Sequence, residues 1–187
     1  MKTNYYTGKG DTATTGLFAT SKRFPKDDIL FDVLGTLDEL NAWLGLCKAS
    51  CNNFDNIQSA NRIRSSIEQT QEHIFIIQAE VAGSEKKLLK IHLWEIEKLI
   101  NQMSENLTAS QDFYIPGGCV LSSFLDIGRT IARRCERIFI HAQKKHTFKN
   151  YLILTAYLNR LSSLLYVLVR FVNEQKNIPE KSPQYNT

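Results

Sequence analysis

Five stretches of this sequence repeat apolar residues at alternating steps of three and four positions. This spacing places apolar side chains on one face of an α-helix. Seams this regular also suit left-handed knobs-into-holes packing between helices. The pattern therefore predicts an all-α bundle of five helices. The five seams run over residues 33–47, 63–81, 89–107, 121–142 and 154–172.

The segments between the seams predict turns, and nothing in them indicates a second domain. We see no strand alternation of useful length, no repeat and no low-complexity tract. We therefore expect one domain over residues 1–187. Residues 1–28, rich in Gly, Thr, Lys and Asp, are expected to form a ligand-binding loop, and residues 174–187 a flexible tail. The breaks fall at Asn52-Asn53, Gly83-Ser84, Pro116-Gly117-Gly118 and residues 146–149.

Composition narrows the classes of partner. The net charge of +4 favours anionic ligands without requiring nucleic acid. The four cysteines have no C-x-x-C spacing, which favours buried thiols in a reducing cytosol over a zinc or redox site. The apolar stretch 151–172 is interrupted by Asn159 and Arg160, so we expect no membrane span. The N-terminus lacks a signal-peptide core, and we expect a cytoplasmic protein.

The stretch RTIARRCERI, residues 129–138, places four arginines on a helix of the bundle. One interpretation is a solvated face with ion pairs three and four residues apart. The other is a polyphosphate site, because arginine forks match phosphate oxygens. Asp38 lies at a packing edge of the first helix, where a buried carboxylate needs a cation. Arg129 is the candidate partner, within a subunit or between subunits.

Three further features have both a structural and a functional interpretation. TGKGDTATTG, residues 7–16, offers glycines, a lysine and hydroxyls to an anion, but it is not a Walker A motif. FYIPGG, residues 113–118, is either a hydrophobic staple at a helix entry or an aromatic presented to a ligand. Asn159 is either a satisfied core amide or a hydrogen-bonding group for a ligand.

Taken together, the motifs resemble those of the PduO-type ATP:cob(I)alamin adenosyltransferases. The match runs from about residue 5 to residue 173. The motifs, in the family's order, are YTGKGDTATTGLF, PKDD at 25–28, GTLDELN at 35–41, FYIPGG, RTIARRCER and LNRLS at 158–162.

The resemblance implies a five-helix, ferritin-like up-and-down bundle that forms a homotrimer with active sites between subunits. It implies transfer of the 5′-deoxyadenosyl group from ATP to cob(I)alamin, with release of triphosphate and a requirement for Mg²⁺. It also implies a reductase that supplies reduced cobalt and a cobalamin-dependent enzyme that accepts the product. The absence of a Ser/His/Asp or Cys/His constellation agrees with this chemistry, because Co(I) is itself the nucleophile.

The family's functional residues carry over onto matching positions of this sequence. Asp38 and Arg129 match an inter-subunit ion pair, and Phe113 matches the aromatic on the lower face of the corrin. With Arg133 these are the implied catalytic residues; Phe113 is also the implied cobalamin contact, and no protein ligand to a metal is assigned. The implied ATP contacts are Thr7, Gly8, Lys9, Gly10, Thr15, Lys26, Arg133, Arg134, Glu136, Arg137 and Asn159.

The sequence departs from the family pattern at three places. Ala13 stands where many members have glycine, Asp126 where many have histidine, and Ser163 where many have aspartate. Asp126 is three residues before Arg129, so it competes with Asp38 for the arginine.

Two other functions remain open at this stage. One is a family member that has lost catalysis and carries or senses ATP or cobalamin. The other is a helical nucleic-acid-binding protein, against which the acids at 27–28 and 38–39 argue.

Overall fold

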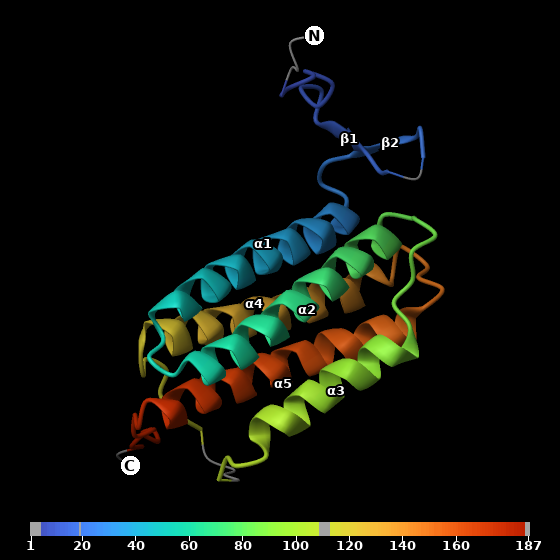
Figure 1. The fold of residues 1–187 in the computed structure, drawn as a ribbon. Coiled ribbons are helices and arrows are strands. Elements are labelled where there is room, and N and C mark those ends of the chain that lie inside the picture. Colours follow the sequence, from blue (N-terminus) through green and yellow to red (C-terminus); the bar gives the residue numbers. More distant parts are fainter. Residues whose placement is uncertain (1–4, 19, 109–112, 186–187) are drawn as a thin grey trace.

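The computed structural model describes residues 5–18, 20–108 and 113–185. Over these residues the chain forms five α-helices and one short hairpin (Figure 1). Residues 1–4 and 19 of the predicted loop, and residues 186–187 of the predicted tail, lie outside this description. The helices are α1 (Ile29–Ser50), α2 (Ile57–Val81), α3 (Lys90–Ser104), α4 (Val120–Ala142) and α5 (Tyr151–Gln175), with a 3-10 turn at Cys51–Asn53 after α1.

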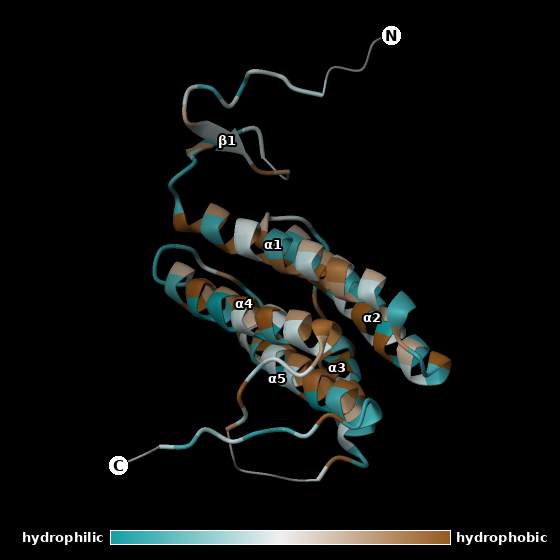
Figure 2. Cartoon of the chain, turned by 90° about the vertical axis from the view of Figure 1, so that its left-hand side faces the viewer, coloured by the Kyte–Doolittle hydropathy of each residue, from teal (hydrophilic) through white to brown (hydrophobic). Residues whose placement is uncertain are grey.

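The helices alternate in direction, so the predicted up-and-down bundle is confirmed. Helix α5 packs between α4 and α3, and α1 packs between α4 and α2. Their apolar faces turn inward, and Figure 2 shows hydrophilic and hydrophobic residues interspersed along the helices. Helices α4 and α5 make the most extensive contact in the bundle, and the candidate site is built on this pair.

Four of the five predicted seams are buried throughout. The third seam is only partly correct. Within it, Ile96 and Met103 are buried, but Leu89 is exposed and Leu88 is fully buried in its place. The reason is that α3 begins at Lys90, so Leu89 is the N-cap residue and does not share the helical period. Leu88 is also fixed by its N–H, which donates to a Glu80 carboxylate oxygen at 2.8 Å.

The N-terminal segment, expected to be a loop, contains a short hairpin that the sequence analysis did not identify. Strands β1 (Thr14–Gly16) and β2 (Arg23–Pro25) pair as a short antiparallel hairpin. Strands of three residues are too short to show an alternating pattern in the sequence. The hairpin is joined to the bundle through Asp28, whose carboxylate accepts from the Leu30 N–H at 2.9 Å and caps α1. The hydrogen bond from Leu30 holds the pKa of Asp28 below its usual value.

Helix α5 has the length and composition of a membrane-crossing helix. Half of its most apolar window is nevertheless buried inside the bundle, as in the core helix of many folded domains. Arg160 pairs with Glu97 of α3 at 3.1 Å. The absence of a membrane span therefore stays a prediction. The length and composition of α5 alone are weak evidence for a span.

The predicted buried thiols are confirmed for Cys47, Cys51 and Cys135, while Cys119 is half-buried; all four are free. Burial raises the pKa of the Cys47 and Cys135 thiols to about 12. They are therefore inert core groups at neutral pH.

A polar chain crosses the core between α5, α2 and α3. The Tyr157 hydroxyl lies 2.9 Å from His73 Nδ1, and His73 Nε2 lies 3.2 Å from Glu95. Burial of the imidazole, followed by the charge of nearby His92, lowers the pKa of His73. The neutral imidazole is thus the favoured form in the folded protein.

Candidate functional site

The arginine face of α4 divides into paired and unpaired side chains. Arg129 Nε donates to Asp126 Oδ1 at 2.7 Å, and Arg134 pairs with Glu39 of α1. Arg133 and Arg137 are exposed, and neither has an ion-pair partner among the residues described. The ion-pair interpretation thus holds for two of the arginines. The polyphosphate interpretation stays a prediction for the other two, whose unneutralised positive surface suits a polyanion.

Glu136 and Asn159 connect this face to α5. Asn159 Nδ2 donates to Glu136 Oε1 at 3.1 Å, and Asn159 Oδ1 accepts from Arg160 at 2.9 Å. Asn159 is exposed, so its interpretation as a core amide is wrong. Its amide is held in a fixed orientation beside the arginines, which places a donor and an acceptor at the edge of the basic surface.

Arg23 organises the N-terminal loop. Its Nε donates to Thr14 Oγ1 at 2.8 Å, and its Nη2 donates to the Lys9 carbonyl at 2.6 Å. No sequence motif indicated this role for Arg23. The Lys26 ammonium lies close to Gly10, where an added Cβ would stand 3.1 Å from its Nζ. The loop therefore places the Lys26 ammonium beside Gly10, which follows Lys9 in the sequence, and we call these three residues the cationic turn.

Ala13 occupies a backbone conformation that favours glycine. Its φ is 56°, in the left-handed region, and its carbonyl accepts from the Lys26 N–H at 2.9 Å. A side chain costs about 1–2 kcal/mol in that region. Ala13, which stands where many family members have glycine, therefore keeps the turn but adds backbone strain.

In the described part of the chain, no contact joins the N-terminal loop to the arginine face. The hairpin projects beyond the start of α1 (Figure 1), and its described hydrogen bonds stay within the segment itself. Thr7 to Gly10, Thr15 and Lys26 form one group of predicted ATP contacts. The arginines, Glu136 and Asn159 form a second group on α4 and α5.

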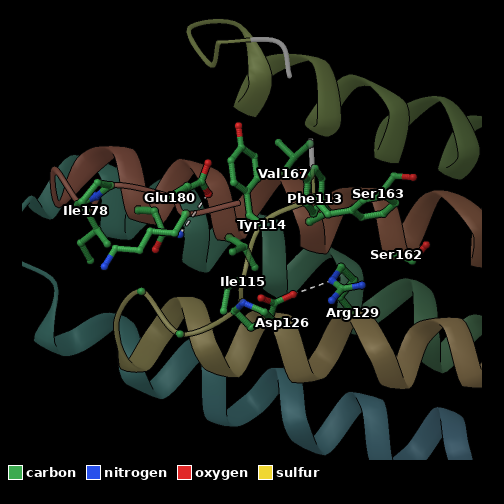
Figure 3. A pocket seen from close by; sticks show the side chains of 18 of the residues that line it. Phe113, Tyr114, Ile115, Asp126, Arg129, Ser162, Ser163, Val167, Ile178 and Glu180 are labelled. Carbon is green, nitrogen blue, oxygen red and sulfur yellow. Dashed lines mark hydrogen bonds and ion pairs between the residues drawn. The ribbon is translucent and has the colours of Figure 1, made fainter. Parts of the chain in front are cut away.

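A cavity of about 990 Å³ lies beside the arginine face, between α4, α5, the 113–118 loop and the tail. Phe113 lines it with a side chain that is 80% exposed (Figure 3). A staple residue would be packed against its helix, so the exposed ring contradicts that interpretation. Arg133 lines the same cavity, as do Asp126 and Arg129, which are joined by the dashed line in Figure 3.

The cavity also includes residues that the sequence analysis did not single out. Ser162 and Tyr166 reach it from α5, and Tyr114 reaches it from the loop. Tyr114 lies inside the FYIPGG motif and Ser162 inside LNRLS, so a signal was present for both. The tail residues 178–181 had no such sequence signal, because we expected the tail to be flexible. The tail instead contacts the bundle and closes one side of the cavity.

The predicted pair of Asp38 and Arg129 is not formed within the chain. Asp38 is exposed and has no ion pair among the described residues. Arg129 is bound by Asp126, and the two side chains are only 27% and 13% exposed. The sequence left Asp38 and Asp126 as alternative partners of Arg129, and within the single chain the partner is Asp126. An inter-subunit role for Asp38 stays a prediction.

Comparison with known proteins points to one family. The family model described as cobalamin adenosyltransferase matches residues 5–172. A corrinoid adenosyltransferase of Citrobacter freundii is 33% identical over 88% of this chain and 92% of its own length. One from Mycobacterium leprae is 31% identical over 94% of each. The corrinoid adenosyltransferase PduO of Salmonella typhimurium is 31% identical, and this chain spans 48% of its length.

Solved structures show the same fold. A PduO-type ATP:corrinoid adenosyltransferase from Lactobacillus reuteri, with one phenylalanine changed to alanine and complexed with cobalamin and ATP, superimposes with a TM-score of 0.87. The two chains are 23% identical, over 97% of this chain and 100% of the other. A variant of that protein with one arginine changed to lysine, complexed with ATP, gives a TM-score of 0.83 at 24% identity, over 96% and 99% of the two chains.

Proposed function

Because the chain belongs to the cobalamin adenosyltransferase family, we propose that it transfers the 5′-deoxyadenosyl group of ATP to cob(I)alamin, giving adenosylcobalamin and triphosphate. One observation carries the proposal: Phe113 and Arg133 line the same cavity. An exposed aromatic suits the flat apolar face of a corrin, and an unpaired guanidinium suits a phosphate chain. The cavity thus holds a group suited to each substrate.

The reaction needs positioning and charge neutralisation more than acid–base groups. Co(I) attacks the ribose C5′ with its electron pair, so that the Co–C5′ bond forms as the C5′–O5′ bond breaks. Triphosphate leaves with the electrons of the broken bond, and cobalt becomes Co(III). The protein must hold C5′ against cobalt and stabilise the leaving anion. On the α4 face, the exposed Arg133 and Arg137 can supply this positive charge.

We assign the cationic turn of the N-terminal loop to ATP as well. Lys9, Gly10 and Lys26 lie together there, and backbone N–H groups near glycine bind anions well. Since this turn and the arginine face lie apart within one chain, we propose that one subunit's loop meets another subunit's α4 in a homotrimer. Asp38, exposed on α1, would then reach Arg129 across the interface.

Phe113 is assigned to the lower face of the corrin. Its ring is 80% exposed, which leaves it free to stack on a ligand. By displacing the lower ligand of cobalt it would leave a four-coordinate Co(II), which is easier to reduce. A reductase and a cobalamin-dependent acceptor enzyme are the partners that this chemistry requires, and a cytoplasmic location would supply ATP.

Mg²⁺ is proposed to arrive with ATP. The described residues contain one cluster of three metal-ligating side chains, His73, His92 and Glu95, and it lies on α2 and α3. Glu136 and Glu39, the acids next to the arginines, are already bonded to Asn159 and Arg134. The α4 face therefore offers no protein cage for Mg²⁺, which would be held by phosphate oxygens and water.

The test is a single incubation of the protein with ATP, Mg²⁺ and chemically reduced cobalamin. We expect the absorbance spectrum to change to that of adenosylcobalamin, and phosphorus NMR to show triphosphate as the co-product. A reaction without ATP is the control. ATP that remains unchanged beside fully reduced cobalamin would refute the enzyme and favour a carrier or sensor of ATP or cobalamin.

A further inference from the structure

Contacts around Arg170 attach the C-terminal tail to the connection between α3 and α4. Arg170 Nε donates to Glu180 Oε2 at 2.9 Å, and its Nη2 donates to the Thr108 carbonyl at 3.1 Å. The same guanidinium lies over the Tyr114 ring, 5.0 Å from the ring centroid. One side chain of α5 therefore contacts the tail, the start of the connection and an aromatic near its end.

Glu180 is held at both carboxylate oxygens. Its Oε1 accepts from Asn173 Nδ2 at 3.2 Å, while Oε2 accepts from Arg170. The side chains of Arg170 and Glu180 are only 12% and 16% exposed. This pair is more shielded than Arg134–Glu39, whose side chains are 46% and 51% exposed. Removing one partner of a shielded pair leaves a partly desolvated charge.

The backbone directs the tail to this position. Asn177 has a φ of 52°. Its N–H donates to the Glu174 backbone carbonyl at 2.9 Å, and the Ile178 N–H donates to the Asn173 carbonyl at 2.9 Å. These bonds form a Schellman motif, which ends α5 and turns the chain back. The returning tail then accepts a hydrogen bond from the Ile115 N–H to the Lys181 carbonyl at 2.8 Å. Tail and loop are thus joined through both side chains and backbone.

Among the described residues, Phe113 makes no contact of this kind with the tail or with Arg170. Its ring is 80% exposed, so its position depends on Tyr114 and Ile115, the next two residues, which Arg170 and Lys181 hold. Figure 3 shows Tyr114 and Ile115 between Phe113 and the tail residues Ile178 and Glu180. We propose that Arg170 and Glu180 are positioning residues, a latch that holds Phe113 over the corrinoid cavity. This inference rests on the proposed function.

Hydrogen–deuterium exchange tests the latch without any substrate. The Ile115 amide is protected by its bond to the tail, so Glu180→Ala should speed exchange over residues 114–118 by about tenfold or more. Arg170→Lys keeps the charge but loses the fork, and should give a smaller increase. Glu174→Ala is the matched control, because it removes the same charge from the exposed end of α5. Circular dichroism should show unchanged helix content in all three.

Kinetics test whether the latch serves the corrinoid. We expect Glu180→Ala to raise KM for cobalamin about tenfold while KM for ATP stays within about twofold of the wild type. Electron paramagnetic resonance of Co(II)cobalamin on the ATP-loaded variant should show less of the four-coordinate species. Unchanged exchange over residues 114–118 would overturn the latch. Faster exchange with unchanged kinetics and an unchanged spectrum would overturn its role in positioning Phe113.

The two proposals fail in different ways. If the wild-type protein does not turn over ATP and reduced cobalamin, the proposed function fails. The exchange comparison between Glu180→Ala and Glu174→Ala still decides in that case whether the tail holds the loop.

Discussion

Changing Gly118 to alanine should destabilise the protein, although the new side chain is a single methyl group. A Cβ at this position would stand 2.2 Å from Asn173 Oδ1 and 3.0 Å from Ser122 Oγ. Neither neighbour is free to retreat. Asn173 is buried and bonded to Glu180, and Ser122 is buried and bonded to the backbone of Cys119.

The magnitude follows from two contributions. Overpacking of a well-filled site costs about 1–3 kcal/mol. Displacing Asn173 also weakens its hydrogen bond to the Glu180 carboxylate, which adds roughly 1 kcal/mol. We therefore expect a loss of about 2–4 kcal/mol, which lowers Tm by about 4–16 °C in a chain of this size.

The assay is thermal unfolding followed by circular dichroism at one fixed protein concentration, because assembly would make Tm depend on concentration. Gly45→Ala is the matched control. A Cβ there would meet only Gln71 Nε2 at 3.7 Å, an ordinary contact in the middle of α1, so alanine should stabilise the helix by about 0.5–1 kcal/mol. Equal Tm values for Gly118→Ala and the wild type would show that Asn173 moves aside freely, and the packing argument would be wrong.

Three other predictions follow from the same structure. Arg133→Ala should lower kcat/KM by about 10- to 100-fold with unchanged helix content, because an exposed guanidinium that binds phosphate contributes about 1.5–3 kcal/mol. Lys98→Ala on α3 is the control, and normal turnover by Arg133→Ala would exclude this residue from the site. Asp38→Asn should weaken the trimer and its activity together, and assembly should lose about 3–5 kcal/mol if the pair with Arg129 is buried between subunits. If light scattering finds the wild type and the variant equally assembled, Arg129 pairs only with Asp126. Burial lowers the pKa of His73, so the unfolded chain binds the proton more readily than the folded chain. The stability that neutral His73 contributes is therefore fully present above about pH 6.5 and is lost as the pH falls below that value. Tm should therefore drop more between about pH 7.5 and about pH 5.5 in the wild type than in His73→Gln, and parallel curves would contradict this assignment.

Much of the site could be predicted from local sequence. Arg133, Phe113 and Asn159 lie in short motifs whose residue types carry the chemistry, and the structure places all three on or beside the arginine face and its cavity. The exposed state of Asn159 could not be predicted. The sequence places it next to Arg160 on an apolar helix, and only the position of α3, with Glu97, shows which side of α5 faces outward.

The sequence by itself determined the number of helices, the faces they bury and the arginine stripe of α4. These features depend on residues three and four positions apart, and that spacing maps directly onto one side of a helix. The start of α3 escaped prediction because Leu88 is buried through a bond to Glu80, eight residues away and outside the helical period.

Tertiary structure alone decided which acid holds Arg129 and how the tail is used. Asp126 reaches Arg129 from the same helix, whereas the packing of α1 against α4 leaves Asp38 exposed and without that contact in the single chain. The tail has no periodic pattern, so nothing local showed that Glu180 meets Arg170 and Asn173, or that Lys181 meets Ile115. Lys181 and Ile115 are far apart in the sequence and belong to irregular segments. Their pairing depends on the turn after α5 and on the path of the loop into α4, and a local sequence pattern predicts neither of these.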